Sequence, residues 1–246
     1  MFKKEFDWVL KEKYGGRLDK RIKADMGRII KGEPIDYVIG FRNFLGCKID
    51  LSYRPLVPRV ETEFWADKMI EEIRKAKKGP IKCLDLFSGS GCIGIAASKH
   101  LKNSKVDFAE IEKKFLKQIS KNLQLNNISL RRIKLIQTDV FRNIRNRYDY
   151  IFANPPYIAE KRKNEVQPEV LKYEPRKSIF AGKDGLFYIK KLLEQGGKYL
   201  KENGKMYIEF SPEQKKKIEE LLGQNRWQNY QFYKDQYKRW RYFKVW

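Results

Sequence analysis

The sequence predicts an α/β fold built on a mostly parallel β-sheet. After residue 58, short apolar runs alternate with longer amphipathic stretches, and 41% of the 246 residues are hydrophobic, which supplies a core. At roughly 100–200 residues per domain, this length allows one full-sized domain with a small appendage. We therefore expect a helical and hairpin domain at 1–57 and a main domain at 58–246.

The first 57 residues are expected to form two short helices followed by a β-hairpin. Apolar residues recur at helical intervals within 1–31, and the turn signal Tyr14-Gly15-Gly16 divides them into two segments. Between residues 32 and 58 the apolar runs become short. The two runs on either side of Gly46 are typical of a hairpin.

The main domain is expected to alternate strands with helices. The strands are predicted at 81–87, 105–110, 132–137, 148–153, 205–210, 228–233 and 239–245. The helices are predicted at 61–77, 91–102, 112–125, 185–201 and 212–223. This order predicts a parallel sheet, and the short polar link between the last two strands predicts an antiparallel hairpin at its end.

The chain is strongly basic: 54 Lys and Arg against 31 Asp and Glu give a net charge of +23. Such a field attracts polyanions, which makes RNA or ribosome proximity plausible, although solvated surface lysines explain the charge equally well. The first ten residues mix charged and apolar side chains too evenly for a secretory signal, and no stretch approaches the roughly 18 apolar residues that span a bilayer. We expect a cytoplasmic protein without membrane contact.

The cysteines and the single histidine argue against metal or triad chemistry. Cys47, Cys83 and Cys92 lack the spacing of metal ligands, and we interpret them as buried thiols. His100 follows a helix-like run, where a cation interacts well with the helix C-terminus. We therefore expect structural roles for all four residues and no metal site.

A glycine-containing loop follows the first strand of the main domain. The strand runs into Phe87-Ser88-Gly89-Ser90-Gly91 before a helix, where glycines allow a tight turn and the helix N-terminus favours negative charge. Glu110 ends the second strand, about 20 residues further on, where an acid can accept both hydroxyls of a ribose. A cofactor containing a nucleoside is indicated. The alternative is a structural turn with a surface glutamate.

The strand at 148–153 runs directly into Asn154-Pro155-Pro156-Tyr157. Ligands of open α/β sheets bind at the carboxyl ends of strands. Because the prolines fix φ and lack N–H groups, the Asn154 side-chain oxygen and the Pro155 carbonyl can each accept one N–H of a planar amide or amine. Tyr157 would stack on that plane or wall it off. The alternative is a proline-rich turn capped by asparagine.

Together these motifs resemble the class I S-adenosylmethionine-dependent methyltransferases that act on planar nitrogen. Within them the chain is similar to the HemK/PrmC family, which methylates the glutamine of the Gly-Gly-Gln motif of peptide chain release factors. The resemblance runs from about residue 33 to the C-terminus, with Phe87 standing where the family has glycine. Its further motifs are Glu33-Pro34-Ile35-Asp36-Tyr37-Val38-Ile39-Gly40, Phe44-Leu45-Gly46, Leu56-Val57-Pro58-Arg59-Val60-Glu61-Thr62-Glu63, Tyr173-Glu174-Pro175 and Ala181-Gly182-Lys183-Asp184-Gly185-Leu186.

The resemblance implies a Rossmann-like class I methyltransferase fold whose seven-stranded, mostly parallel sheet has an antiparallel last strand. It implies S-adenosyl-L-methionine as cofactor, S-adenosyl-L-homocysteine as product, a release factor as protein substrate and a small N-terminal substrate-recognition domain. We expect the enzyme to be a monomer.

The site residues that the resemblance implies fall into two groups. The cofactor-binding group is Phe87, Ser88, Gly89, Ser90, Gly91, Glu110, Asp139, Val140 and Asn154, in which Glu110 would hold the ribose and Asp139 and Val140 would border the adenine. The catalytic group is Asn154, Pro155, Pro156 and Tyr157. Glu61, Thr62 and Glu63 either close over the cofactor or serve as a helix cap and its acidic dipole partners.

Two other functions stay open. An rRNA or DNA exocyclic-amine methyltransferase is favoured by the net charge and by the Phe-Ser-Gly-Ser-Gly loop, and opposed by the Pro-Arg-Val-Glu-Thr-Glu and Tyr-Glu-Pro segments. A ribosome-associated binding module would keep the fold without transferring a methyl group. The presence of every expected site residue argues against that module.

Overall fold

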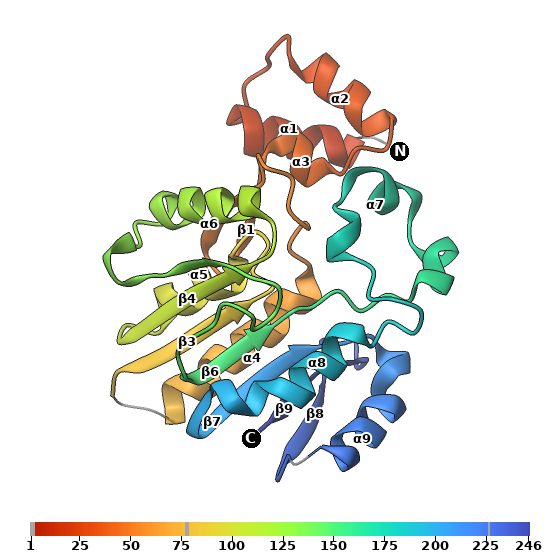
Figure 1. Ribbon diagram of the computed structural model, residues 1–246. Helices are drawn as coiled ribbons and strands as arrows, with labels where there is room; N and C mark the ends of the chain where they lie inside the picture. Colours follow the sequence, from red (N-terminus) through yellow and green to blue (C-terminus); the bar gives the residue numbers. More distant parts are fainter. Residues whose placement is uncertain (1–2, 77–78, 226) are drawn as a thin grey trace.

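The computed structural model of the protein describes residues 3–76, 79–225 and 227–246. A seven-stranded sheet with helices on both faces forms its main body, and short helices and a two-stranded hairpin precede it along the chain (Figure 1). The predicted α/β class is confirmed.

The elements have the following bounds. The strands are β1 Phe41–Phe44, β2 Cys47–Asp50, β3 Ile81–Leu86, β4 Ser104–Glu110, β5 Leu135–Gln137, β6 Tyr148–Ala153, β7 Leu200–Glu209, β8 Tyr230–Lys234 and β9 Trp240–Val245. The α-helices are α1 Lys3–Tyr14, α2 Ile22–Ile30, α3 Ile35–Ile39, α4 Val60–Ala76, α5 Cys92–His100, α6 Lys113–Leu125, α7 Pro168–Tyr173, α8 Phe187–Gln195 and α9 Lys215–Gln224.

The order of strands in the large sheet is β5-β4-β3-β6-β7-β9-β8. All neighbouring pairs are parallel except those that β9 makes with β7 and β8, which confirms the antiparallel last strand. The chain runs outward from β3 through β4 to β5 and then returns to pair β6 with β3. This reversal makes the carboxyl ends of β3 and β6 a topological switch point, where open α/β sheets bind ligands.

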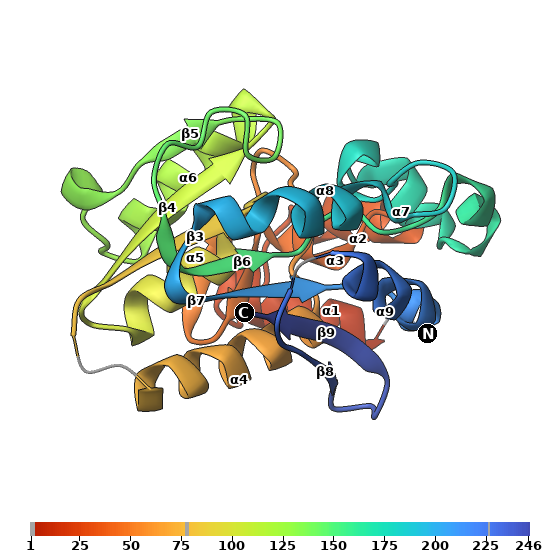
Figure 2. The same ribbon diagram turned by 60° about the horizontal axis from the view of Figure 1, so that its bottom comes forward.

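Helices cover both faces of the sheet, as Figure 2 shows for α8 on one side and α4 on the other. The side chains of each strand alternate between these faces. On β6, Tyr150 and Phe152 join a core cluster with residues of α4, α5 and α6, whereas Ile151 and Ala153 join a cluster with residues of α8 and α9. The central strands are therefore buried on both faces, which explains their continuous apolar runs.

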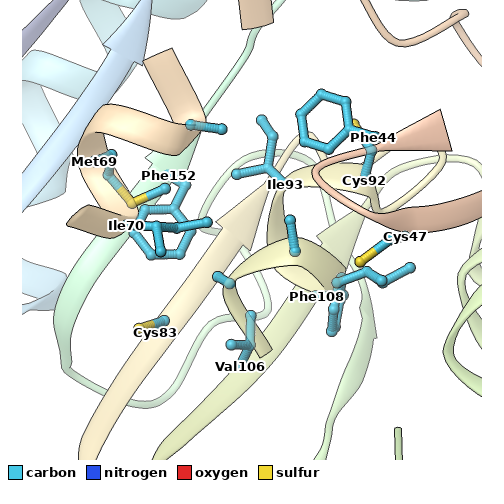
Figure 3. Packing of buried hydrophobic residues seen from close by; sticks show 14 of the residues in the cluster. Phe44, Cys47, Met69, Ile70, Cys83, Cys92, Ile93, Val106, Phe108 and Phe152 are labelled. Carbon is cyan, nitrogen blue, oxygen red and sulfur yellow. The ribbon is translucent and has the colours of Figure 1, made fainter. Parts of the chain in front are cut away.

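The β1–β2 hairpin shares the core of the main sheet. Phe44 and Cys47 are directed into the same cluster as Phe108 of β4 (Figure 3). Asp50 of β2 is tied to α6, because its backbone N–H donates to Asn122 Oδ1 at 2.8 Å. Helices α1 to α3 have a small cluster of their own, around Val9, Val38 and Ile39. The predicted division at residue 57 stays a prediction.

Several predicted boundaries are wrong. The helix predicted at 185–201 ends at Gln195, and a 3₁₀ turn at Gly196–Tyr199 leads into β7, since two consecutive glycines disfavour a longer helix. The strand predicted at 132–137 pairs only over Leu135–Gln137, after a 3₁₀ turn at Leu130–Arg132. The helix predicted at 61–77 is α4, and residue 77 lies outside the described residues. Helices α3 and α7 were not predicted.

The interpretation of the cysteines as buried thiols is confirmed, and His100 lies at the end of a helix as predicted. Cys47, Cys83 and Cys92 are buried and form no disulfide. His100 is the last residue of α5, and its Nε2 lies 2.8 Å from the carbonyl oxygen of Leu45. Within the described part of the chain, no helix combines the length and the apolar character that crossing a membrane requires.

Candidate active site

A pocket opens at the carboxyl ends of β3, β4 and β6, at the switch point of the sheet. It encloses about 920 Å³ of atom-free space, part of it open to solvent. Most of the predicted site residues line it, namely Phe87, Ser88, Gly89, Ser90, Glu110, Asp139, Val140, Asn154 and Pro156. Gly91, Pro155 and Tyr157 are not among its wall residues.

The loop after β3 turns sharply into α5. Gly91, directly before α5, has a φ of +81°, and a Cβ there would come within 3.1 Å of Ile119 on α6, so glycine permits both the turn and the close packing. Phe87 also adopts a left-handed conformation, with a φ of +61°. Its ring meets that of Tyr188 edge-on, with centroids 5.2 Å apart. The loop thus exposes backbone to the pocket at a helix N-terminus.

Glu110 is the last residue of β4 and is buried beside this loop. Its Oε2 accepts the backbone N–H of Gly89 at 2.9 Å, and its Oε1 accepts those of Ile111 at 2.8 Å and Glu112 at 3.0 Å. Burial raises the pKa of Glu110, while the three N–H donors oppose that rise. A carboxylate offers about four lone-pair directions, so Glu110 keeps one for a ligand hydroxyl.

Asp85, near the end of β3, is a second buried acid at this end of the sheet. Its Oδ2 accepts the N–H of Gly94 at 2.9 Å, whereas its Oδ1 has no partner among the described residues. A Cβ on Gly94 would approach Phe108 to 2.4 Å, so glycine is required for this contact. Burial raises the pKa of Asp85 to about 7, and the negative charge of Glu110 contributes to the rise.

Asn154 follows β6 and takes part in a buried hydrogen-bond chain. Its Nδ2 donates to Thr62 Oγ1 at 3.2 Å, and Thr62 donates to Glu209 Oε2 at 2.7 Å. Helix α4 begins at Val60, so Thr62 lies in its first turn with its hydroxyl in this chain and is not the cap. Thr62 also lines the pocket, which supports the interpretation that this segment closes over it.

Tyr157 lies at a neighbouring pocket. It lines that second pocket together with Arg59 and Arg162, and its hydroxyl donates to Glu209 Oε1 at 3.2 Å. Burial and the nearby Glu209 carboxylate raise the pKa of Tyr157. Tyr157 is thus linked to Asn154 by hydrogen bonds through Glu209 and Thr62, but the two residues do not line the same pocket.

Two motif segments that are distant in sequence meet beside the pocket. Glu174, directly after α7, is buried, and its Oε1 lies 2.7 Å from the Arg59 guanidinium. Its Oε2 accepts the N–H of Val57 at 3.3 Å. Close by, Lys177 forms a 2.7 Å ion pair with Glu112, and both residues line the pocket. The segment around α7 therefore forms part of the pocket wall.

Sequence reasoning missed Asp85 and Glu209. Each is a charged residue within an otherwise apolar strand, in Cys83-Leu84-Asp85-Leu86 and Met206-Tyr207-Ile208-Glu209-Phe210. Because a buried charge is costly without compensation, an acid inside such a run signals a specific partner. That signal was available, but it does not identify the partner.

Comparisons with known proteins agree with this geometry. A family model described as the methyltransferase small domain matches residues 65–176. The release factor glutamine methyltransferase of Lactococcus lactis is 32% identical over 214 residues, which cover 87% of this chain and 77% of that protein. Other curated relatives of the same name are 30–33% identical.

Solved structures share the fold at lower identity. The ribosomal protein L11 methylase of Lactobacillus delbrueckii matches with a TM-score of 0.56 and 22% identity, over 79% of this chain and 81% of that one. The 16S rRNA N2 G1207 methyltransferase of T. thermophilus, in complex with AdoMet and guanosine, matches with a TM-score of 0.57 and 15% identity, over 83% and 49%. These likenesses show a methyltransferase fold.

Proposed function

This chain belongs to the release factor glutamine methyltransferase family, and from that membership we propose its reaction. The protein transfers a methyl group from S-adenosyl-L-methionine to the side-chain amide nitrogen (N5) of the glutamine in the Gly-Gly-Gln motif of a peptide chain release factor. The observation that carries this proposal is the position of Asn154, whose amide lines the same pocket as Glu110 and the glycine loop.

The pocket residues fit S-adenosylmethionine. Gly91 permits the close turn of the loop, and Glu110 retains a free lone pair that would accept a ribose hydroxyl. Asp139 and Val140 line the pocket, where they would border the adenine. Asp85, next to this loop, has a buried Oδ1 without a partner among the described residues, and such an acceptor suits a cofactor that carries an ammonium and a sulfonium group. When bound, the cofactor supplies an electrophilic methyl group.

The remaining chemistry is positioning of the glutamine amide. The amide nitrogen is a weak nucleophile, because its lone pair is delocalised into the carbonyl. Asn154 Oδ1 and the Pro155 carbonyl accept its two N–H groups and hold it in line with the methyl group. Orientation of two bound reactants lowers a barrier by roughly 7–11 kcal/mol at best. The same fixed acceptors stabilise the positive charge that grows on the nitrogen, and its proton leaves during or after attack.

Asn154→Ala tests this function. The substitution removes one acceptor of the substrate amide, so kcat for a release factor should fall by about 100-fold or more, the scale seen when one preorganised polar group is removed. The dissociation constant of S-adenosylmethionine, measured by calorimetry, should change far less. Equal losses in kcat and in cofactor affinity would assign Asn154 a binding role only.

The second candidate function is methylation of an exocyclic amine in rRNA or DNA, which the net charge of +23 favours. The same acceptors would bind an exocyclic –NH2. Incubation of the protein and labelled cofactor with a release factor in one tube and with rRNA in another separates the two functions. Label in nucleic acid alone would replace the release factor as substrate.

The proposed reaction has further consequences for partners and location. We also propose that the enzyme is a monomer. An activity on release factors belongs in the cytoplasm, where translation takes place, and the basic surface would favour proximity to the ribosome. Residues 1–57 are proposed as the part that recognises the release factor.

A further inference from the structure

Glu209 is a buried carboxylate that bonds three parts of the active site together. It ends β7, and the register pair Ala153 and Ile208 sets it next to the start of the Asn-Pro-Pro-Tyr turn. It is only 1% exposed. Its oxygens accept from Thr62 at 2.7 Å, from the indole Nε1 of Trp65 at 2.6 Å and from the hydroxyl of Tyr157 at 3.2 Å.

These bonds have a defined direction. The indole N–H of Trp65 can only donate, and an ionised carboxylate can only accept. Thr62 has a single hydroxyl hydrogen, and it points to Glu209 Oε2. The Thr62 oxygen can then only accept from Asn154, so the atom of Asn154 that faces it is the Nδ2 amide nitrogen, at 3.2 Å.

The direction of the hydrogen bonds from Asn154 through Thr62 to Glu209 fixes the orientation of the Asn154 amide. With Nδ2 bonded to Thr62, Oδ1 is the remaining polar atom, and no hydrogen bond within the described parts of the chain occupies it. Burial raises the pKa of Glu209, whereas its three donors and the nearby guanidinium of Arg241 favour the ionised form. The carboxylate is thus surrounded by groups that keep it an acceptor.

We propose that Glu209 is a positioning residue which, through the hydroxyl of Thr62, holds the Asn154 amide with Oδ1 toward the substrate nitrogen. This inference rests on the proposed function and explains how the site selects a substrate group that donates N–H bonds. If the Thr62 hydroxyl donated to Asn154 instead, the amide would turn over. Its NH2 group would then oppose the NH2 group of the substrate, and two donors cannot bond to each other.

Substitutions of Thr62 and Glu209, the two residues that orient Asn154 through hydrogen bonds, test the proposal. Thr62→Val keeps the shape and removes the hydroxyl. Glu209→Gln keeps the shape and replaces the charged acceptor with a neutral amide, whose oxygen stays toward the Trp65 N–H, so the hold on the Thr62 hydroxyl weakens. Both should lower kcat for the release factor by about 10–100-fold, because small misplacements of a reacting group cost this much. In Glu209→Gln, whose altered residue does not line the pocket, S-adenosylmethionine affinity should stay close to that of the wild type, and Thr62→Ser, which keeps the hydroxyl, should keep most of the rate.

Glu72→Gln is the matched control. Glu72 lies on the same helix, α4, and also accepts from the sheet, from Lys205 of β7 at 3.2 Å and from Lys244 of β9 at 2.8 Å. Glu72 does not line the pocket, so its loss should lower stability without lowering kcat. Wild-type kcat in Thr62→Val would overturn the proposal, even if Glu209→Gln does not fold.

A second readout separates this proposal from the proposed function. In ¹⁵N-labelled protein, the side-chain NH2 resonance of Asn154, assigned with Asn154→Asp, should shift in Thr62→Val and in Glu209→Gln but not in Glu72→Gln. Unchanged resonances in the first two variants would overturn the orienting role. A wild-type protein that labels no release factor, while these resonances shift as expected, would overturn the proposed substrate and leave the orientation of Asn154 supported.

Discussion

At the carboxyl end of β3, Phe87 adopts a backbone conformation that glycine would adopt at lower cost. Its φ of +61° lies in the left-handed region, where a side chain costs roughly 1–2 kcal/mol. Contact of its ring with Tyr188, at 5.2 Å between centroids, offsets part of this cost. The resemblance to the family predicts a glycine at this residue, and the observed φ is one that glycine adopts readily.

Comparison of Phe87→Gly with Phe87→Ala isolates this backbone cost. Both variants lose the ring, so they differ mainly in backbone conformation. Glycine normally destabilises relative to alanine, but here Phe87→Gly should be more stable than Phe87→Ala by about 1 kcal/mol, because only alanine keeps the left-handed strain. Urea unfolding measures the difference. A more stable alanine variant would show that the loop is not strained at this residue.

Asp85 makes stability depend on pH in a direction opposite to that of a salt-bridged acid. Burial raises its pKa from 3.8 to about 7, so the folded state binds a proton that the unfolded state releases between these values. Proton binding by Asp85 therefore stabilises the folded state fully below about pH 4, and this stabilisation is lost as the pH rises toward 7. We expect Asp85→Asn to lose this dependence.

The free energy of unfolding of wild type and Asp85→Asn should be compared from pH 4 to pH 8. The free energy of unfolding of the variant should rise relative to that of the wild type by about 2–4 kcal/mol between pH 4 and pH 8. The reason is that a tenfold change in proton affinity corresponds to about 1.4 kcal/mol. Other titrating groups are common to both proteins and cancel in the difference. A difference that stays constant with pH would contradict the raised pKa.

At the scale of elements, two ion pairs attach the segment around α7 to the rest of the pocket, and their surroundings differ. The side chain of Glu174 is 1% exposed where it meets Arg59, whereas that of Lys177 is 73% exposed where it meets Glu112. Exposed pairs contribute about 0–1 kcal/mol, while removal of one partner of a buried pair costs about 3–5 kcal/mol. The Glu174 pair should therefore dominate the attachment.

Glu174→Ala should loosen the α7 segment, and Lys177→Ala should not. The first variant leaves the Arg59 guanidinium and the Val57 N–H without their acceptor, although the partial exposure of Arg59 keeps the loss below that of a fully buried pair. Limited proteolysis between residues 158 and 186 reports the loosening. Equal cleavage rates in the two variants would show that the buried pair does not hold the segment.

Some helices and strands could be predicted from the sequence and others could not. The central strands β3, β4 and β6 were located because both of their faces are buried, so that each reads as an apolar run. The strand 148–153 was predicted with the bounds of β6. Helix α7 was missed because its six residues carry no core residue, and tertiary contacts such as the one between Glu174 and Arg59 anchor it. Residues within one motif, such as Asn154, were identified, whereas Glu209 and Thr62 lie 147 residues apart and meet only in the folded chain.

At the scale of the whole molecule, residues 1–57 contribute to two separate hydrophobic clusters. The hairpin contributes Phe44 and Ile49 to the main cluster and α3 contributes Tyr37, whereas α1 and α2 depend on a small cluster around Val9 and Val38. One of the contacts that tie these helices to the rest is the bond from the Tyr173 hydroxyl to the Lys31 carbonyl, at 3.1 Å. Few buried apolar contacts mean a low free energy of local opening.

Hydrogen exchange followed by mass spectrometry should therefore divide residues 1–57 into two parts. Amides of α1 and α2 should exchange at a lower opening free energy than those of β1 and β2, whose exchange should match that of β3 and β4, because the hairpin cannot open without exposing the main core. Uniform protection across residues 1–57, below that of the main sheet, would instead support an independent domain ending at residue 57. The hairpin also packs on α6, which borders the pocket loop at Gly91. The shared core therefore predicts that the hairpin cannot open on its own without disturbing the pocket.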